Sequence, residues 1–242
     1  MLGAVSADAQ AVTPTHSPIY ARSNTFSIFS AYSGNSGHML MGDAEERRLL
    51  EFGVGYSRKL LANRMVNWQY NGELLPVTLE SDPTAQGTYN QLTPVQQTYI
   101  NPPAVQIAAC TPKSGSYTDT FTYNGGSTIY SGTYVITCGR RWTIGEGISP
   151  VGFQWNFLPR KKLQPFFIGH GGYMYSTHPI PMPDAGSFNF TFDFGAGLEL
   201  YRSQSKSVRA EYRFHHISNH NTANQNPGID NGLFQVTYSF GR

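Results

Sequence analysis

Apolar side chains alternate with polar or small ones along much of this chain. The clearest run covers residues 187–201, where every second position from Phe188 to Leu200 is apolar and the positions between are polar or glycine. A repeat of two places successive side chains on opposite faces of a β-strand. The run exceeds the ~5–6 residues usual in soluble sheets and suits a tilted strand that crosses a bilayer.

The same alternation recurs along the sequence and predicts further strands. Two of these segments, 26–32 and 165–175, are less regular than the rest. Together with residues 187–201, the pattern predicts eight antiparallel strands. The other seven segments are 26–32, 50–57, 66–71, 151–157, 165–175, 208–215 and 234–240.

The chemistry of the two faces separates a membrane barrel from a soluble one. The apolar faces are rich in Phe, Trp and Tyr, as membrane interfaces are. No run approaches the ~20 apolar residues of a transmembrane helix. We therefore predict an all-β fold, an eight-stranded antiparallel transmembrane β-barrel, with a soluble lipocalin-like binder as the alternative. The charges on the polar faces suit a polar lumen better than an apolar ligand cavity: Glu51, Asp193, Glu199, Arg209, Glu211 and Arg213.

The links between the predicted strands alternate in length. Short periplasmic turns and long outer loops are typical of outer-membrane barrels. The link 80–146 is too long for a plain loop. We predict that it is an extracellular β insertion between the third and fourth strands of a single barrel domain, 25–242. The short links are 59–63, 159–163 and 203–206, and the long ones are 34–47, 80–146, 176–186 and 219–229.

Both cysteines, Cys110 and Cys138, lie in that predicted insertion. A pair that closes a loop fits an oxidising compartment, so we predict a disulfide. Two unrelated thiols are the alternative. Residues 1–24 are predicted to be an N-terminal tail, or the remnant of an export signal, since Ala7-Asp8-Ala9 has the small-x-small pattern that ends a signal peptide.

The composition excludes several classes of protein. Charged residues are 13% of the chain, against ~25% in ordinary soluble domains. Aromatic residues are 14%, which argues against a disordered chain or a helix bundle. The net charge of +2 provides no basic field for nucleic acid, so no nucleic-acid partner is expected.

The densest group of reactive side chains lies where the second-to-last predicted strand ends and the last one begins. His216 and Ser218 are two residues apart, so both point to one face, the outward face of Tyr212 and Phe214. Asp230 begins the next strand with the parity of its outward residues. Serine, imidazole and carboxylate on one face form a nucleophile, base and orienting group. Nearby Asn219 and Asn226 are candidate oxyanion donors.

Two other interpretations of this group are open. Polar residues at a strand end are usually only surface near a loop. A metal site could involve His215, His216 and His220. However, His215 and His216 lie on opposite faces of a strand, and no Cys or Glu completes a ligand set. We therefore expect no metal and no other cofactor, and we expect His170 to face the lumen or the aromatic girdle.

Residues 209–240 resemble the end of the PagL-type lipid A 3-O-deacylases, which are outer-membrane esterases. Their pattern is a strand ending in His-x-Ser-Asn, then a loop with Asn-x-Gly and a carboxylate. His216-Ile217-Ser218-Asn219 matches the first part, and Asn226-Pro227-Gly228-Ile229-Asp230 matches the second. The usual carboxylate is Glu, and Asp230 is one methylene shorter. The insertion is also larger than a minimal member would carry.

The resemblance implies an enzyme of the bacterial outer membrane. Ser218 would be the nucleophile, His216 the general base, Asp230 the orienting group, and Asn226 and Asn219 oxyanion donors. The substrate would be the 3-O acyl ester of lipid A, part of lipopolysaccharide, reached from an outer wall that contacts membrane lipids near the outer leaflet. A homodimer is compatible with the sequence. A non-enzymatic adhesin or structural barrel is the competing function.

Overall fold

The computed structural model describes residues 19–242, so most of the predicted tail 1–24 lies outside the described residues. Within that range no helix is long and apolar enough to cross a membrane. The chain forms one antiparallel sheet of eleven strands, which confirms the predicted all-β class. The elements are β1 (Asn24–Ser33), β2 (Arg48–Ala62), β3 (Val66–Thr93), β4 (Gln97–Ile100), β5 (Ala104–Val105), β6 (Lys113–Tyr123), β7 (Gly126–Phe157), β8 (Leu163–Ser176), the 3-10 helix η1 (Pro183–Ala185), β9 (Phe188–Tyr201), β10 (Lys206–Ser218) and β11 (Ile229–Gly241).

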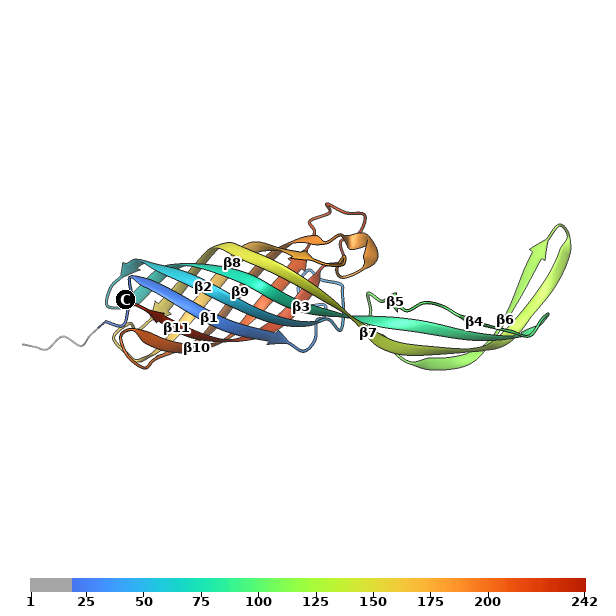
Figure 1. The fold of residues 1–242 in the computed structure, drawn as a ribbon, viewed down its shortest axis with the longest axis horizontal. Coiled ribbons are helices and arrows are strands. Elements are labelled where there is room, and N and C mark those ends of the chain that lie inside the picture. Colours follow the sequence, from blue (N-terminus) through green and yellow to red (C-terminus); the bar gives the residue numbers. More distant parts are fainter. Residues whose placement is uncertain (1–18) are drawn as a thin grey trace, which may run out of the picture.

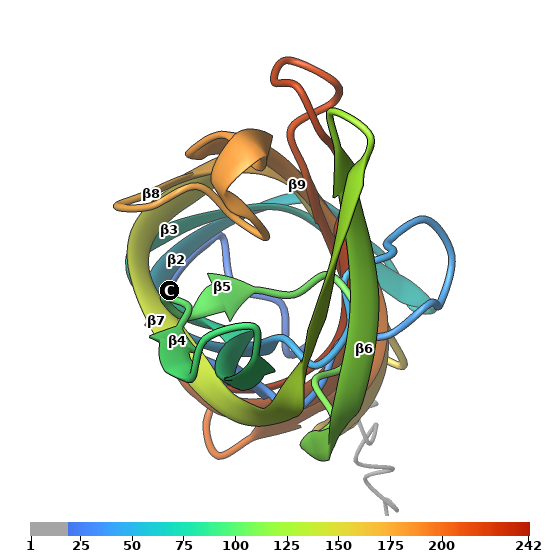
Figure 2. The ribbon, with the colours of Figure 1, turned by 90° about the vertical axis from the view of Figure 1, so that its right-hand side faces the viewer.

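The sheet closes on itself. Strand β1 pairs with β2, β2 with β3, and β3 with β7. From β7 the pairing continues through β8, β9 and β10 to β11, which pairs with β1. Figure 2 looks into the resulting ring. The alternating segments of the sequence all fall in these ring strands, because alternation gives each strand one apolar and one polar face.

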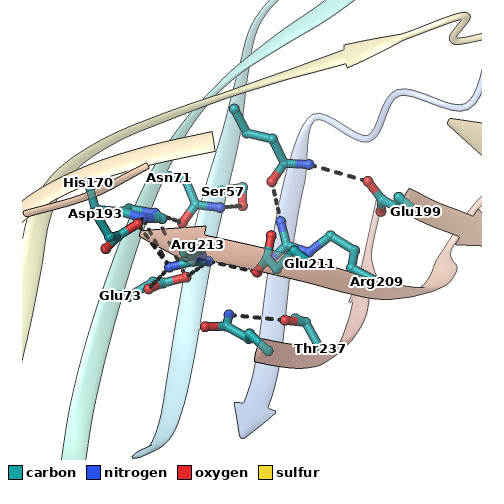
Figure 3. Close-up of polar contacts among 12 residues, drawn as sticks. Ser57, Asn71, Glu73, His170, Asp193, Glu199, Arg209, Glu211, Arg213 and Thr237 are labelled. Carbon is teal, nitrogen blue, oxygen red and sulfur yellow. Dashed lines mark hydrogen bonds and ion pairs between the residues drawn. The ribbon is translucent and has the colours of Figure 1, made fainter. Parts of the chain in front are cut away.

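The apolar face of the ring points outward and the charged face points inward. Phe190, Tyr212 and Phe234 are exposed on the outer wall, whereas Glu211 and Arg213 are buried inside. Arg213 occupies the middle of the lumen, where its guanidinium contacts the carboxylates of Glu73, Asp193 and Glu211 (Figure 3). His170 lies in this network, with its Nδ1 3.0 Å from Asp193 Oδ1. Paired charges of this kind can fill a barrel interior without leaving a carboxylate isolated.

At the end of the lumen near the long loops, apolar residues replace the charges. Ile217 and Ile229, on the inward faces of β10 and β11, belong to this cluster. It seals the interior directly behind the strand ends that carry His216 and Asp230, so those strand ends rest on a packed base. The cluster comprises Ala31, Ala44, Leu49, Met174, Ile180, Ile217, Ile229 and Leu233.

Strands β3 and β7 continue far beyond the ring as a paired ribbon (Figure 1). They span 28 and 32 residues, and β4, β5 and β6 add to the ribbon. The sequence suggests a separate β unit between two spanning strands, but the spanning strands themselves run into it. Thr, Tyr, Val and Ile dominate the segment, and residues of these types sustain strands. A disulfide joins Cys110 to Cys138 on β7.

Candidate active site

The register of β10 against β11 brings two of the predicted site residues together. His216 lies directly opposite Asp230 in the pairing. Its Nδ1 is 2.6 Å from Asp230 Oδ1. Tyr212 shares the strand face of His216 and is exposed on the outer wall, so the pair lies on the outward side of the barrel.

The second oxygen of Asp230 is held by backbone. The N–H groups of Leu40 and Met41 donate to Oδ2 at 2.7 and 2.8 Å. A carboxylate that accepts three hydrogen bonds at once is ionised. His216 Nδ1 is then the donor to Asp230, which leaves Nε2 as the unprotonated nitrogen that can accept a proton.

Leu40 and Met41 belong to the loop between β1 and β2, residues 34–47, which lies over the site. Its backbone also bonds the β10–β11 loop, with Asp43 N donating to Pro227 O at 2.6 Å and Ala44 N to Gly228 O at 3.1 Å. As a result His216 and Asp230 are only 6% and 0% exposed. The sequence predicts that they face lipid directly. Their outward parity is as predicted, but the loop covers them.

Glycines make this close packing possible. A Cβ on Gly42 would lie 2.6 Å from Asp230 N and 2.9 Å from Ile229 C, both backbone atoms. Gly228 has a φ of +62°, which is costly for other residues, and a Cβ there would lie 3.1 Å from His216 Cε1. The two loops can therefore seat against the imidazole and carboxylate only with glycine at these positions.

The same loop is anchored to the ribbon. Glu45 Oε2 accepts the Ala109 N–H at 2.7 Å, and this hydrogen bond lowers the pKa of the Glu45 carboxyl below its usual range. Arg47 is completely buried, and its guanidinium bonds Asp82 and the carbonyls of Ile107 and Pro181. One arginine therefore ties three loops together beside the site.

Ser218 and His216 line one shallow hollow on the outer wall. It encloses about 410 Å³ and has a mainly apolar lining. Phe192 packs against the imidazole with ring centroids 5.1 Å apart. The hydrogen bonds within residues 19–242 do not include one between the Ser218 hydroxyl and His216. The lining residues are Met41, Phe190, Thr191, Phe192, His216, Ser218 and His220.

The two predicted oxyanion donors have different surroundings. Asn219 is buried, and its Nδ2 donates to Ala185 O and Gln225 O, so its amide hydrogens are used to shape the loop. Asn226 Oδ1 accepts the Asn219 N–H at 3.0 Å. That bond fixes the orientation of the Asn226 amide, and its Nδ2 has no acceptor among residues 19–242.

His215 and His220 have different surroundings from His216. His215 is buried on the inward face, and His220 packs its ring against Phe190. The part of the chain that the structure describes contains no group of three or more His, Cys, Asp or Glu residues that could hold a metal ion. The histidine cluster of the sequence is therefore divided between two faces of the wall.

The sequence does not mark loop 34–47 as part of the site. Its contacts with Asp230 run through the backbone N–H groups of Leu40 and Met41, which any sequence can supply. The only signal was its length, which marked it as one of the long loops. The site brings together a hydroxyl and an imidazole that contacts a carboxylate, the three groups that nucleophilic attack on an ester can use.

Comparison with known proteins identifies a family. A family model described as lipid A 3-O-deacylase (PagL) matches residues 108–239. A search of curated proteins finds no match.

Several solved structures are similar in fold. The outer membrane enzyme PagL has a TM-score of 0.48 at 13% identity, covering 89% of this chain and 99% of that chain. Neisserial surface protein A has a TM-score of 0.41 at 9% identity, covering 91% of this chain and 97% of that chain. The outer membrane protein OprG from Pseudomonas aeruginosa has a TM-score of 0.38 at 8% identity, covering 93% of this chain and 100% of that chain. Identities this low carry no information on activity, so the family model alone bears on function.

Proposed function

This chain belongs to the lipid A 3-O-deacylase (PagL) family, and we propose that it hydrolyses the ester-linked acyl chain at position 3 of lipid A with Ser218, His216 and Asp230. The family consists of enzymes that hydrolyse an ester, which favours catalysis over a purely structural or adhesive barrel. The observation that supports the assignment of residues most strongly is the hydrogen bond between His216 and Asp230 beside Ser218.

In the acylation step, Ser218 Oγ attacks the ester carbonyl carbon and its proton passes to His216 Nε2. The carbonyl oxygen becomes an oxyanion, for which the Asn226 amide is the proposed side-chain donor. When the tetrahedral intermediate collapses, the carbon–oxygen bond to the sugar breaks and His216 returns the proton to the departing sugar hydroxyl. The acyl chain remains on Ser218.

In the deacylation step, His216 takes a proton from water, and the resulting hydroxide attacks the acyl-enzyme carbonyl. Collapse of the second tetrahedral intermediate releases the fatty acid and restores the Ser218 hydroxyl with the proton held by His216. No cofactor takes part in either step of this proposal. Asp230 keeps the Nδ1–H tautomer throughout and stabilises the imidazolium formed in each step. Asn219 acts as a positioning residue, through the Asn226 amide.

We place the eight ring strands in the bacterial outer membrane, with the long loops and the ribbon on the extracellular side. The exposed aromatic outer wall and the charged lumen support this placement. The hollow at Ser218 then opens at the level of the outer leaflet. A glycolipid could reach the hydroxyl there without leaving the membrane. An esterase site on the outer wall is therefore accessible to a membrane-lipid substrate.

The test is release of fatty acid from purified lipopolysaccharide by the refolded protein. We expect hydroxy fatty acid from the parent protein and none above background from Ser218→Ala or His216→Ala. Each variant must also show the heat-dependent gel shift of a folded barrel. Undiminished release by folded Ser218→Ala would reject the assigned nucleophile, and no release by the folded parent would reject the activity.

A further inference from the structure

Positive charge gathers at the end of the barrel opposite the candidate active site. The three short turns of the ring and the strand residues beside them, 58–64, 158–163 and 202–206, contain eight lysines and arginines and no aspartate or glutamate. None of these eight forms an ion pair with any residue in 19–242. The end is therefore a strongly basic rim, and its members are Arg58, Lys59, Arg64, Arg160, Lys161, Lys162, Arg202 and Lys206.

Two of these cations border a hollow in the outer wall. Arg58 and Lys59, at the end of β2, line a hollow of about 590 Å³ together with Tyr56, Leu60, Tyr70 and Phe153. The hollow thus joins two positive charges to three aromatic rings. That combination suits a molecule with an anionic group at one end and an apolar body.

A second hollow continues from the first along the wall, away from the turns. It encloses about 630 Å³, its lining is mainly apolar, and it shares Tyr56 and Tyr70 with the first. Gly72, at an outward position of β3 between Tyr70 and Leu74, leaves the wall without a side chain at that point. The β3–β7 register also shifts between Tyr70 and Glu73. Its outward apolar lining includes Phe26, Ile28, Val54, Leu74, Ile148 and Pro150.

The tyrosines that join the two hollows are fixed. Tyr56 OH donates to Asn24 Oδ1 at 2.7 Å and Tyr70 OH donates to Pro150 O at 2.6 Å. Their rings therefore form a preformed boundary rather than mobile surface groups. Neither hollow shares a residue with the one that contains Ser218, which lies on the β9–β10 part of the wall.

The two hollows together form one crevice. We propose that this crevice binds one anionic phospholipid from the leaflet that surrounds the short turns. Its phosphate group lies between Arg58 and Lys59, and an acyl chain follows the apolar hollow over Gly72. Each cation near a membrane surface adds about 1 kcal/mol of attraction for anionic lipid, and the other rim cations raise the local concentration of such lipids. The inference rests on the membrane placement proposed above and not on the esterase chemistry.

The test uses phosphatidylglycerol and phosphatidylcholine with brominated acyl chains as quenchers of tryptophan fluorescence in vesicles. Trp68 reports on the crevice, because its ring lies 5.8 Å from Phe153. Trp142→Phe removes the one tryptophan near the opposite end of the ring, leaving Trp68 and Trp155. We expect phosphatidylglycerol to associate roughly tenfold more tightly than phosphatidylcholine, since two cations at about 1 kcal/mol each are partly screened.

Matched variants distinguish binding in the crevice from general attraction of anionic lipid to all the cations of the basic rim. Arg58→Gln with Lys59→Gln should abolish most of the preference, whereas Arg202→Gln with Lys206→Gln, on the same rim but outside the crevice, should change it less than about twofold. Val54→Phe should reduce quenching by both lipids, and Val236→Phe, exposed on another part of the wall, should not.

Equal association of both lipids with the folded parent, or equal losses in the two double variants, would overturn the proposal. A barrel that fails to insert into vesicles would instead overturn the membrane placement. Loss of esterase activity alone would leave the lipid result standing, so the two proposals fail separately.

Discussion

Asp230 reaches His216 although its side chain is one methylene shorter than the Glu of the family pattern. The direct pairing of the two residues across β10 and β11 provides the short distance. Leu40 and Met41 hold the other carboxylate oxygen, and Gly42 fills the remaining space so closely that a Cβ there would lie 3.0 Å from Asp230 Cγ. The loop and the shorter side chain therefore fit one another.

This fit predicts that Asp230→Glu is harmful, although Glu is the usual residue of the family. The added methylene must displace the backbone at Gly42, and a misplacement of about 1 Å costs roughly 100-fold in rate. Asp230→Asn should be at least as harmful, with a loss of roughly 10²–10⁴-fold, because the wrong tautomer of His216 becomes favoured. Steady-state kcat/KM on lipopolysaccharide measures both. An Asp230→Glu enzyme as active as the parent would contradict the close fit.

Gly42→Ala tests the same contact from the loop side. Its Cβ would meet the backbone of Ile229 and Asp230 at under 3 Å, so the loop must shift and release the Asp230 carboxylate. We expect roughly a 10–100-fold lower kcat in the same assay. Gly37→Ala in the same loop is the control, because a Cβ there has nothing within 4 Å. Similar losses in both variants would mean that loop flexibility, rather than this contact, is responsible.

Among the elements, the loop 34–47 depends on Arg47 for its position. The guanidinium is buried and bonds carbonyls from its own loop, from the segment after β5 and from the segment before η1, as well as Asp82. Arg141 also bonds Asp82, so Asp82 would retain one partner if Arg47 were replaced. The site thus depends on an ion pair that lies outside it.

Arg47→Met should lower the free energy of unfolding by about 3 kcal/mol, since it leaves several buried carbonyls and part of a buried ion pair without a donor. Denaturant titration in detergent micelles measures this. Arg48→Met is the control, because the neighbouring Arg48 is exposed. If both substitutions cost the same, Arg47 does not act as a buried anchor.

The disulfide should stabilise only the ribbon. It closes a separation of 28 residues, for which the chain-entropy estimate is about 3–4 kcal/mol. Replacing both Cys110 and Cys138 with Ser should make the ribbon sensitive to limited proteolysis while the heat-dependent gel shift of the ring persists. Loss of that shift in the double variant would show that the ring depends on the disulfide.

Strand positions and faces could be predicted because they are local. A repeat of two fixes which residues share a face, and this correctly gave the outward parity of His216 and Asp230 and the inward burial of Glu199. The cover over the site could not be predicted, because backbone N–H groups of Leu40 and Met41 leave no mark in a sequence. The continuation of β3 and β7 into the ribbon could not be predicted either, since pairing over such a length depends on contacts between distant segments.

At the scale of the whole molecule, the two ends of the ring differ in chemistry. The end with the long loops carries the His216–Asp230 pair, the apolar cluster at the end of the lumen and the ribbon (Figure 1). The other end carries the cations of the basic rim, none of which forms an ion pair within residues 19–242. In our proposal these ends contact different leaflets, the first presenting its ester-cleaving site to a glycolipid and the second binding anionic phospholipid. The molecule therefore has one orientation in the membrane under this proposal.

The most direct test of the central claim is a mass spectrum of lipid A from Gram-negative cells that express this protein or its Ser218→Ala variant at equal levels in the outer membrane. We predict that the parent removes one hydroxyacyl group, that position 3 becomes a free hydroxyl, and that the variant leaves lipid A unchanged. An unaltered spectrum with the folded parent protein, or the same loss with Ser218→Ala, would contradict the account.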